Sequence, residues 1–172
     1  HQEETNNFFT DPNLLAYYPK YSMEDVKENV KGYETFIPPD QVQMKLTAFR
    51  NQASFLKRYV DAGGKIVAAS DITQSVPGLG LHQEIAVFVE DVGVTPKQAL
   101  LSATSWVADG FKIPDIGPIQ AGKLADIVVL DADPHADHMN LRRINTVIKD
   151  GKVVDRSYDR NYKAWMFHNS MD

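Results

Sequence analysis

Asp71 is the residue in this sequence whose position best suits chemistry. It lies just beyond the apolar run of residues 65–69, and such a run is typical of a strand buried on both faces of a parallel sheet. α/β enzymes hold catalytic groups at the carboxy ends of these strands, because the strand ends converge there and loops supply the other groups. An aspartate in this place can bind a metal ion, move a proton or cap the next turn. Position alone favours the turn cap.

The histidines are weaker candidates for a site. His82 follows Asp71 at the junction between a loop and a predicted helix. It could contact a substrate there, although packing or hydrogen bonding at the helix start is the favoured role. His135 and His138 lie near two aspartates and superficially suggest a metal cluster, but the neighbouring proline favours a surface turn. His168, close to the carboxy end, is uninformative.

A long amphipathic helix is predicted immediately before the apolar run. It follows Pro38 and Pro39, and its apolar residues recur at steps of three and four, which places them on one face: Val42, Leu46, Phe49, Ala53, Leu56 and Val60. Gly63 and Gly64 end it, because glycine accepts the left-handed conformation that a helix end requires. The order of helix, glycine pair and buried strand is typical of a βα barrel or an open α/β sheet.

Two further helices are predicted after Asp71. The first has apolar residues facing inward and ends at Gly93, and Glu84 is expected to cap or pair at its start. The second begins at Thr95, where a capping hydroxyl, a proline and a glutamine form a capping box. The pattern predicts that this helix continues to about Val107.

The pattern changes to short β segments beyond Gly110. They are predicted around Ile119 and at residues 126–130 and 145–148. Asp150-Gly151 predicts a hairpin turn, because both central residues must tolerate positive φ. The signals before residue 38 are weaker: a short strand ending near Phe9, a turn, and a short helix.

Composition excludes several classes of protein. The fractions of hydrophobic and charged residues, 43% and 24%, are those of a globular chain. The net charge of −5 is small and the charged residues are scattered along the sequence, which does not suggest a nucleic-acid or membrane partner. The absence of cysteine excludes disulfides and thiolate metal sites and leaves the compartment open. Because the sequence begins with His1, we expect the true amino terminus, with any targeting signal, to be missing.

Several segments in one order resemble the amidohydrolase superfamily, in its imidazolonepropionase-like and prolidase-like branch. Residues 64–71 resemble the eighth barrel strand with its terminal aspartate, although Ala69 and Ser70 stand where the family usually has glycine and threonine. The loop and the two helices that follow in the family are similar to residues 77–84 and 93–104. Its closing strands are similar to residues 116–119, 122–126 and 147–154. Each segment is modest alone, but the set is specific.

The resemblance implies an α/β fold: the last strands and helices of a TIM-like metal-dependent-hydrolase barrel, followed by short strands of a flanking β-sandwich. The change of pattern places a boundary near Lys112, so that residues 1–112 are assigned to the incomplete barrel and residues 113–156 to the sandwich strands. Residues 157–172, in which aromatic residues recur without a period, are assigned to a tail. Lys123 and Asp126 would then belong to a turn and a strand that build the sandwich. The same comparison makes the segment around His135 and His138 a surface turn.

The resemblance also implies a role for Asp71. It would be the last metal ligand and would accept the proton of the attacking water, passing it on to the leaving group. The implied cofactor is a divalent metal, zinc as one or two ions, and the implied substrate is a small molecule or a dipeptide-like amide. His82 is the candidate for a substrate contact.

The family's other ligands, among them a His-x-His pair, do not occur in this sequence, and one aspartate cannot hold a catalytic zinc. The leading hypothesis is therefore a hydrolase of amide or other C–N bonds whose remaining ligands precede His1, and which is inactive as this chain alone. The alternative is a catalytically incomplete fragment that acts as a folded or domain-swapped interaction module, a homo-oligomer included. A self-contained enzyme that uses His82, His135 and His138 with Asp71 is the third possibility and the least favoured.

Overall fold

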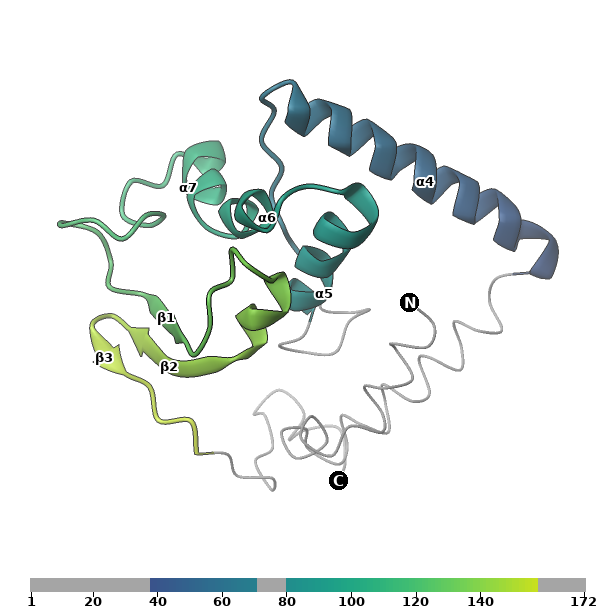
Figure 1. Ribbon diagram of the computed structural model, residues 1–172. Coiled ribbons are helices and arrows are strands. Elements are labelled where there is room, and N and C mark those ends of the chain that lie inside the picture. The colour runs from purple at the N-terminus through teal and green to yellow at the C-terminus, as the bar shows by residue number, and fades with distance from the viewer. Residues whose placement is uncertain (1–37, 71–79, 158–172) are drawn as a thin grey trace, which may run out of the picture. The chain divides into compact units, whose positions relative to one another are not determined.

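The computed structural model describes residues 38–70 and 80–157 (Figure 1). The chain divides into two units, one of Asp40–Val154 and one of His1–Pro39 with Asp155–Asp172, and the description below concerns the first. Asp71, the weak elements predicted before residue 38 and the tail after residue 157 all lie outside the described residues.

The predicted long helix is present as α4, Pro39–Asp61. The charges at its ends complement the helix dipole, with the acidic Asp40 in the first turn and the basic Arg58 in the last. Gly63, just after the helix, has the left-handed conformation at φ 88°. The expected apolar face is buried only in its second half: Ala53 and Val60 are 7% and 5% exposed, whereas Phe49 is 38% exposed. The sequence therefore predicted the helix correctly but not how much of the face is covered.

Gly63 and the helical Gly110 provide a matched test of the end of α4. A Cβ at either position would meet no neighbouring atom within 4 Å, but only Gly63 has a positive φ. We therefore expect Gly63→Ala to lower the free energy of unfolding by about 1–2 kcal/mol, because alanine is strained in the left-handed region. Gly110→Ala should instead raise it by up to about 1 kcal/mol. Denaturant titration of both variants checks this, and equal effects would contradict it.

The apolar run after α4 is extended but is not paired as a strand within the described residues. Its side chains alternate: Ile66 and Ala68 are buried against the helices, whereas Lys65 and Ala69 are exposed. Ala68 N–H donates to the Ser102 carbonyl at 3.0 Å. The expectation of a strand buried on both faces is wrong here, because no described strand lies beside this segment to form a ladder with it.

The first helix predicted after Asp71 is present as α5, Gly80–Val87, continued by a π-helical turn, η1, Phe88–Val92. Gly93 ends it at φ 79° with its N–H bonded to the Phe88 carbonyl. The predicted inward-facing residues are confirmed, since Ile85, Phe88 and Val92 are at most 6% exposed and Val89 packs against them. The π turn itself was not predicted.

The capping-box helix is α6, Pro96–Ser102. Gln98 N–H donates to Thr95 Oγ1 at 3.2 Å and Thr95 N–H donates to Gln98 Oε1 at 2.9 Å, which confirms the box. The prediction that this helix reaches Val107 is wrong, because the chain turns at residues 103–104 and a new helix, α7, Ser105–Phe111, begins. Ser102 and Thr104 hydroxyls donate back to carbonyls three and four residues earlier, and such bonds compete with a regular helix.

The carboxy-terminal segment forms a three-stranded antiparallel sheet in the order β1-β2-β3. The strands are β1, Ile127–Leu130, β2, Ile144–Lys149, and β3, Lys152–Val153, with a short 3₁₀ helix, η2, His138–Arg142, between β1 and β2. The hairpin is confirmed, with Asp150 and Gly151 at φ 51° and 75°. The β segment expected at Ile119 is wrong, since that residue lies in a bend and is 87% exposed.

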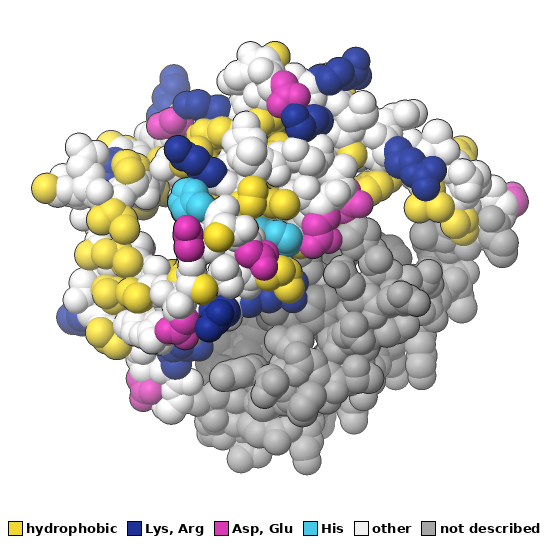
Figure 2. Space-filling view, in the orientation of Figure 1, with side chains coloured by type: hydrophobic (Ala, Val, Ile, Leu, Met, Phe, Trp, Pro, Cys, Tyr) yellow, Lys and Arg dark blue, Asp and Glu magenta, His cyan; other side chains and the backbone are white. Residues whose placement is uncertain are grey.

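Apolar side chains of this sheet are open to solvent. Val128 is 52% exposed and Val153 is 71% exposed, and Figure 2 shows yellow hydrophobic side chains over the sheet region. The described residues supply one sheet and not the two layers of the predicted sandwich. The sandwich therefore stays a prediction.

Candidate functional site

The structure describes the approach to Asp71 but not the residue itself. The extended segment carries the chain from the end of α4 to Ser70, which is exposed. Ile66 and Ala68 hold that segment against the helical core, in which Phe88, Val94 and Ala99 are buried. The role of Asp71 as a ligand and proton carrier stays a prediction.

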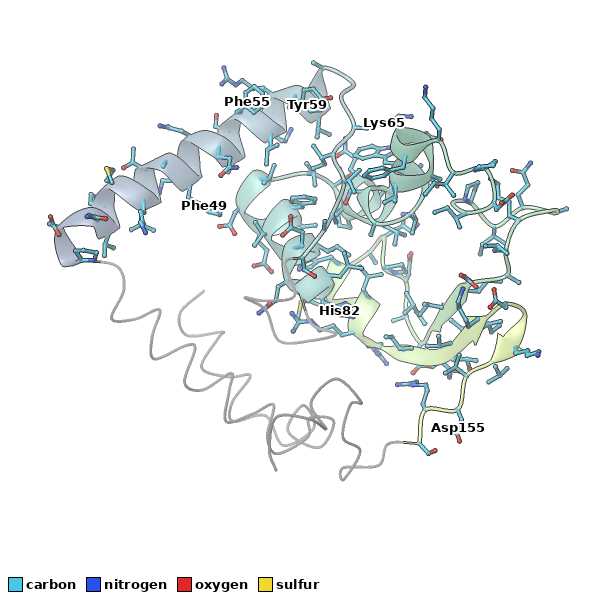
Figure 3. All side chains as sticks on the ribbon, turned by 180° about the vertical axis from the view of Figure 1, so that it is seen from behind. Phe49, Phe55, Tyr59, Lys65, His82 and Asp155 are labelled. Atoms are coloured by element: carbon cyan, nitrogen blue, oxygen red, sulfur yellow. The ribbon has the colours of Figure 1, made fainter. Side chains whose placement is uncertain are left out.

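His82 lies on the first turns of α5, as Figure 3 shows. Its side chain is half-buried, and Nδ1 is buried without a hydrogen-bond partner. Burial, followed by the positive charge of Arg142 from η2, lowers the pKa of His82 below its ordinary value of 6.5. The imidazole is therefore neutral at neutral pH, a state suited to hydrogen bonding rather than to ion pairing.

The lowered pKa makes folding depend on pH in a definite direction. Below pH 6.5 the unfolded chain binds a proton at this histidine more readily than the folded chain does. The free energy of unfolding should therefore fall as the pH drops from 6.5 toward the folded-state pKa. Denaturant titrations at neutral and mildly acidic pH measure this, and His82→Gln should show a smaller fall. An identical fall in that variant would contradict the assignment to His82.

Glu84 was expected to cap or pair at the start of α5. In the described part of the chain its carboxylate makes no hydrogen bond or ion pair, so that expectation is not met, and burial raises the pKa of Glu84. The first turns of this helix thus carry two half-buried titratable side chains, and burial is the largest cause of the pKa shift of each.

His135 lies in a turn, as predicted, whereas His138 begins η2 and its side chain is only 13% exposed, so the prediction of a surface turn holds for His135 alone. The backbone N–H of His135 donates to Asp133 Oδ1 at 2.8 Å. The His138 side chain contacts a different carboxylate, since its Nε2 lies 3.1 Å from Glu90 Oε1. Among the described residues, no group of three His, Cys, Asp or Glu side chains could hold a metal ion. Sequence reasoning missed the pairing of His138 with Glu90, because 48 residues separate the two.

The pair of Glu90 and His138 connects η1 to η2. The His138 side chain is 13% exposed and the Glu90 side chain 41%, so water screens the contact only in part. A double-mutant cycle with Glu90→Gln and His138→Gln should give a coupling energy of about 0.5–1.5 kcal/mol. The exposed pair of Lys65 and Asp109 is the control, with an expected coupling of about 0–0.5 kcal/mol. Equal couplings would show that the first contact does not hold η2 to the helix.

Lys123 and Asp126 have structural roles, as the family resemblance implied. Lys123 Nζ donates to the Pro114 and Ile116 carbonyls at 2.8 and 3.0 Å. Asp126 accepts from Asp150 N–H at 2.9 Å and from Lys149 Nζ at 2.6 Å, and these bonds, the backbone one first, lower the pKa of Asp126. Both side chains build the turn and the hairpin.

No helix among residues 38–70 and 80–157 is both long enough and apolar enough to cross a bilayer.

The order of these elements agrees with a known class of protein. The sequence profile of the amidohydrolase family matches residues 16–154, well over half of the chain. The chain therefore belongs to the amidohydrolase family, as the residues around Asp71 and the closing strands predicted.

The relatives lie in the predicted branch. Imidazolonepropionase of Streptomyces griseus subsp. griseus is 39% identical over 85 residues, which cover 46% of this chain and 20% of that protein. A prolidase solved with N-methylphosphonate-L-proline is 28% identical with a TM-score of 0.59, over 73% of this chain and 31% of that one. A Xaa-Pro dipeptidase with methionine in its active site is 30% identical with a TM-score of 0.51, over 60% and 25%. The chain thus spans a fifth to a third of the length of these relatives.

Proposed function

We propose that this chain is the carboxy-terminal part of a metal-dependent amidohydrolase that hydrolyses an amide or another C–N bond. The observation that carries the proposal is the family match over residues 16–154, which spans Asp71 and the sheet. The core of α5, η1 and α6 supports it, because it anchors the extended segment that leads to Asp71.

Asp71 is the proposed catalytic residue of this chain. Its carboxylate would be one metal ligand, would accept a proton from the attacking water and would deliver that proton to the leaving nitrogen as the C–N bond breaks. When bound, a divalent cation, zinc as one or two ions, would make its bound water more acidic and would polarise the substrate carbonyl. The described residues contain no metal site, so the other ligands would come from another part of the barrel.

The substrate would be a small amide, either cyclic or dipeptide-like. Support comes from the relatives, which are named as an imidazolonepropionase, a prolidase and a Xaa-Pro dipeptidase. His82 is the proposed substrate contact in this chain, because it comes soon after Asp71 in the sequence and its side chain is only half-buried.

Reassembly with the missing part of the barrel tests the proposal. The 172-residue chain would be co-expressed with the amino-terminal barrel segment of the Xaa-Pro dipeptidase relative, and hydrolysis of methionyl-proline and of imidazolonepropionate would be measured. We expect no hydrolysis by the chain alone and hydrolysis of one substrate by the pair. Full activity of the isolated chain would contradict the proposal, and so would a gene without a His-x-His strand upstream.

A second function, as a non-catalytic interaction module, is favoured by one observation. Within the described residues, the extended segment at 65–69 has no strand beside it, and free strand edges pair readily with other chains. Such a module would bind its partner equally well as Asp71→Asn, whereas the reassembled enzyme would lose its activity. Size-exclusion chromatography with light scattering would reveal a self-paired homo-oligomer.

A further inference from the structure

The two ring nitrogens of His82 lie in different surroundings. Nδ1 is enclosed by protein atoms and has no hydrogen-bond partner, and it is the one buried side-chain nitrogen or oxygen atom among the described residues that lacks a partner. Nε2 is not among the buried atoms that lack a partner, and the residue as a whole is only half-buried. The side of the ring that carries Nδ1 is therefore the more enclosed one.

This asymmetry decides which nitrogen carries the proton. A buried N–H without an acceptor is rarer in proteins than a buried acceptor that lacks a donor. A neutral imidazole has one N–H and one lone pair, so the lower-energy tautomer buries the lone pair at Nδ1. Burial and the charge of Arg142 both oppose a second proton on the ring.

We infer that His82 holds its proton on Nε2 and donates a hydrogen bond from Nε2–H to an acceptor oxygen, a carbonyl or carboxylate, of the substrate. The inference rests on the proposed function and adds to it the atom, the tautomer and the kind of substrate group. His82 is then a binding residue that orients an oxygen, and it transfers no proton. The starting turns of α5 hold it in place, because Gly80, Ile85 and Ala86 of that helix are buried.

The tautomer can be measured without turnover. Nitrogen NMR of the full 172-residue chain, labelled at its histidines, separates the protonated and the lone-pair nitrogen of each neutral ring, and the signals absent from His82→Gln belong to His82. We expect protonation at Nε2 and a lone pair at Nδ1 at neutral pH. Protonation at Nδ1, or on both nitrogens, would overturn the inference.

A pair of substitutions tests the hydrogen bond itself. The glutamine amide can place its N–H₂ near the position of Nε2, whereas the shorter asparagine places it near Nδ1. In the reassembled enzyme with methionyl-proline, we expect His82→Asn to raise KM about tenfold at unchanged kcat. His82→Gln should stay within about threefold of wild type.

His135→Asn is the matched control, since His135 is exposed and only its backbone N–H is bonded within the turn. It should leave KM unchanged. Equal losses in the two His82 variants, or a fall in kcat instead of a rise in KM, would overturn the inference. Inactivity of the wild-type pair would count against the proposed function itself, and the NMR result would still decide the tautomer.

Discussion

Replacing Asp71 by Asn in the reassembled enzyme is expected to lower kcat by at least about a thousandfold. The amide keeps the size of the carboxylate but cannot accept the proton of the attacking water, and it binds a cation more weakly. Both changes act on the chemical step. Steady-state hydrolysis of methionyl-proline or imidazolonepropionate measures the loss.

Asp109→Asn is the control for Asp71→Asn. Asp109 is an exposed aspartate that pairs with Lys65 at 2.6 Å, and such surface pairs contribute about 0–1 kcal/mol to stability. Its substitution should leave kcat within about twofold of wild type. If Asp71→Asn also stayed in that range, Asp71 would be the turn cap that its position alone favours.

Phe88→Ala is expected to produce the largest loss of stability in the described core. Phe88 is 6% exposed, lies in the cluster that joins η1 to α4 and α6, and begins the π turn. Truncating a buried phenylalanine to alanine removes about 3–5 kcal/mol from the free energy of unfolding. That is a large fraction of the roughly 5–15 kcal/mol that holds a domain folded. Denaturant unfolding followed by circular dichroism measures the change.

Phe111→Ala is the matched control, because Phe111 is 66% exposed at the end of α7. It should shift the unfolding free energy by less than about 0.5 kcal/mol. A similar small shift for Phe88→Ala would mean that the core does not hold η1 in place. The extended segment before Asp71 would then lack the support that its proposed role requires.

Local signals in the sequence predicted most of the described elements. Thr95 and Gln98 formed the capping box, Gly63 and Gly93 ended their helices, and Asp150-Gly151 formed the hairpin turn. Each of these depends on the conformational preference of a few adjacent residues. Such preferences act in any tertiary context, and so the sequence reveals them.

Features that depend on distant neighbours were predicted less well. Residues 65–69 have the composition of a strand, but a strand also needs a partner, and no described residue supplies one. The face of α4 is apolar throughout, yet Phe49 is exposed while Val60 is buried. An apolar pattern indicates what a face can pack against, and tertiary contacts decide which part is covered.

In the candidate site, too, features that depend on distant residues could not be predicted from local sequence. Position and family resemblance indicate Asp71, and no local pattern separates a metal ligand from a turn cap. The buried Nδ1 of His82 is visible only in three dimensions, because it depends on how the ring packs. The contact between Glu90 and His138 likewise joins residues that lie far apart in the sequence.

Metal analysis tests whether Asp71 completes a metal site together with the rest of the barrel. The isolated chain and the reassembled pair would be purified, loaded with zinc, dialysed and measured by atomic emission. We predict stoichiometric metal, one or two ions per complex, in the reassembled pair and no metal retained by the chain alone. Stoichiometric metal in the isolated chain, or none in the reassembled pair, would contradict this prediction.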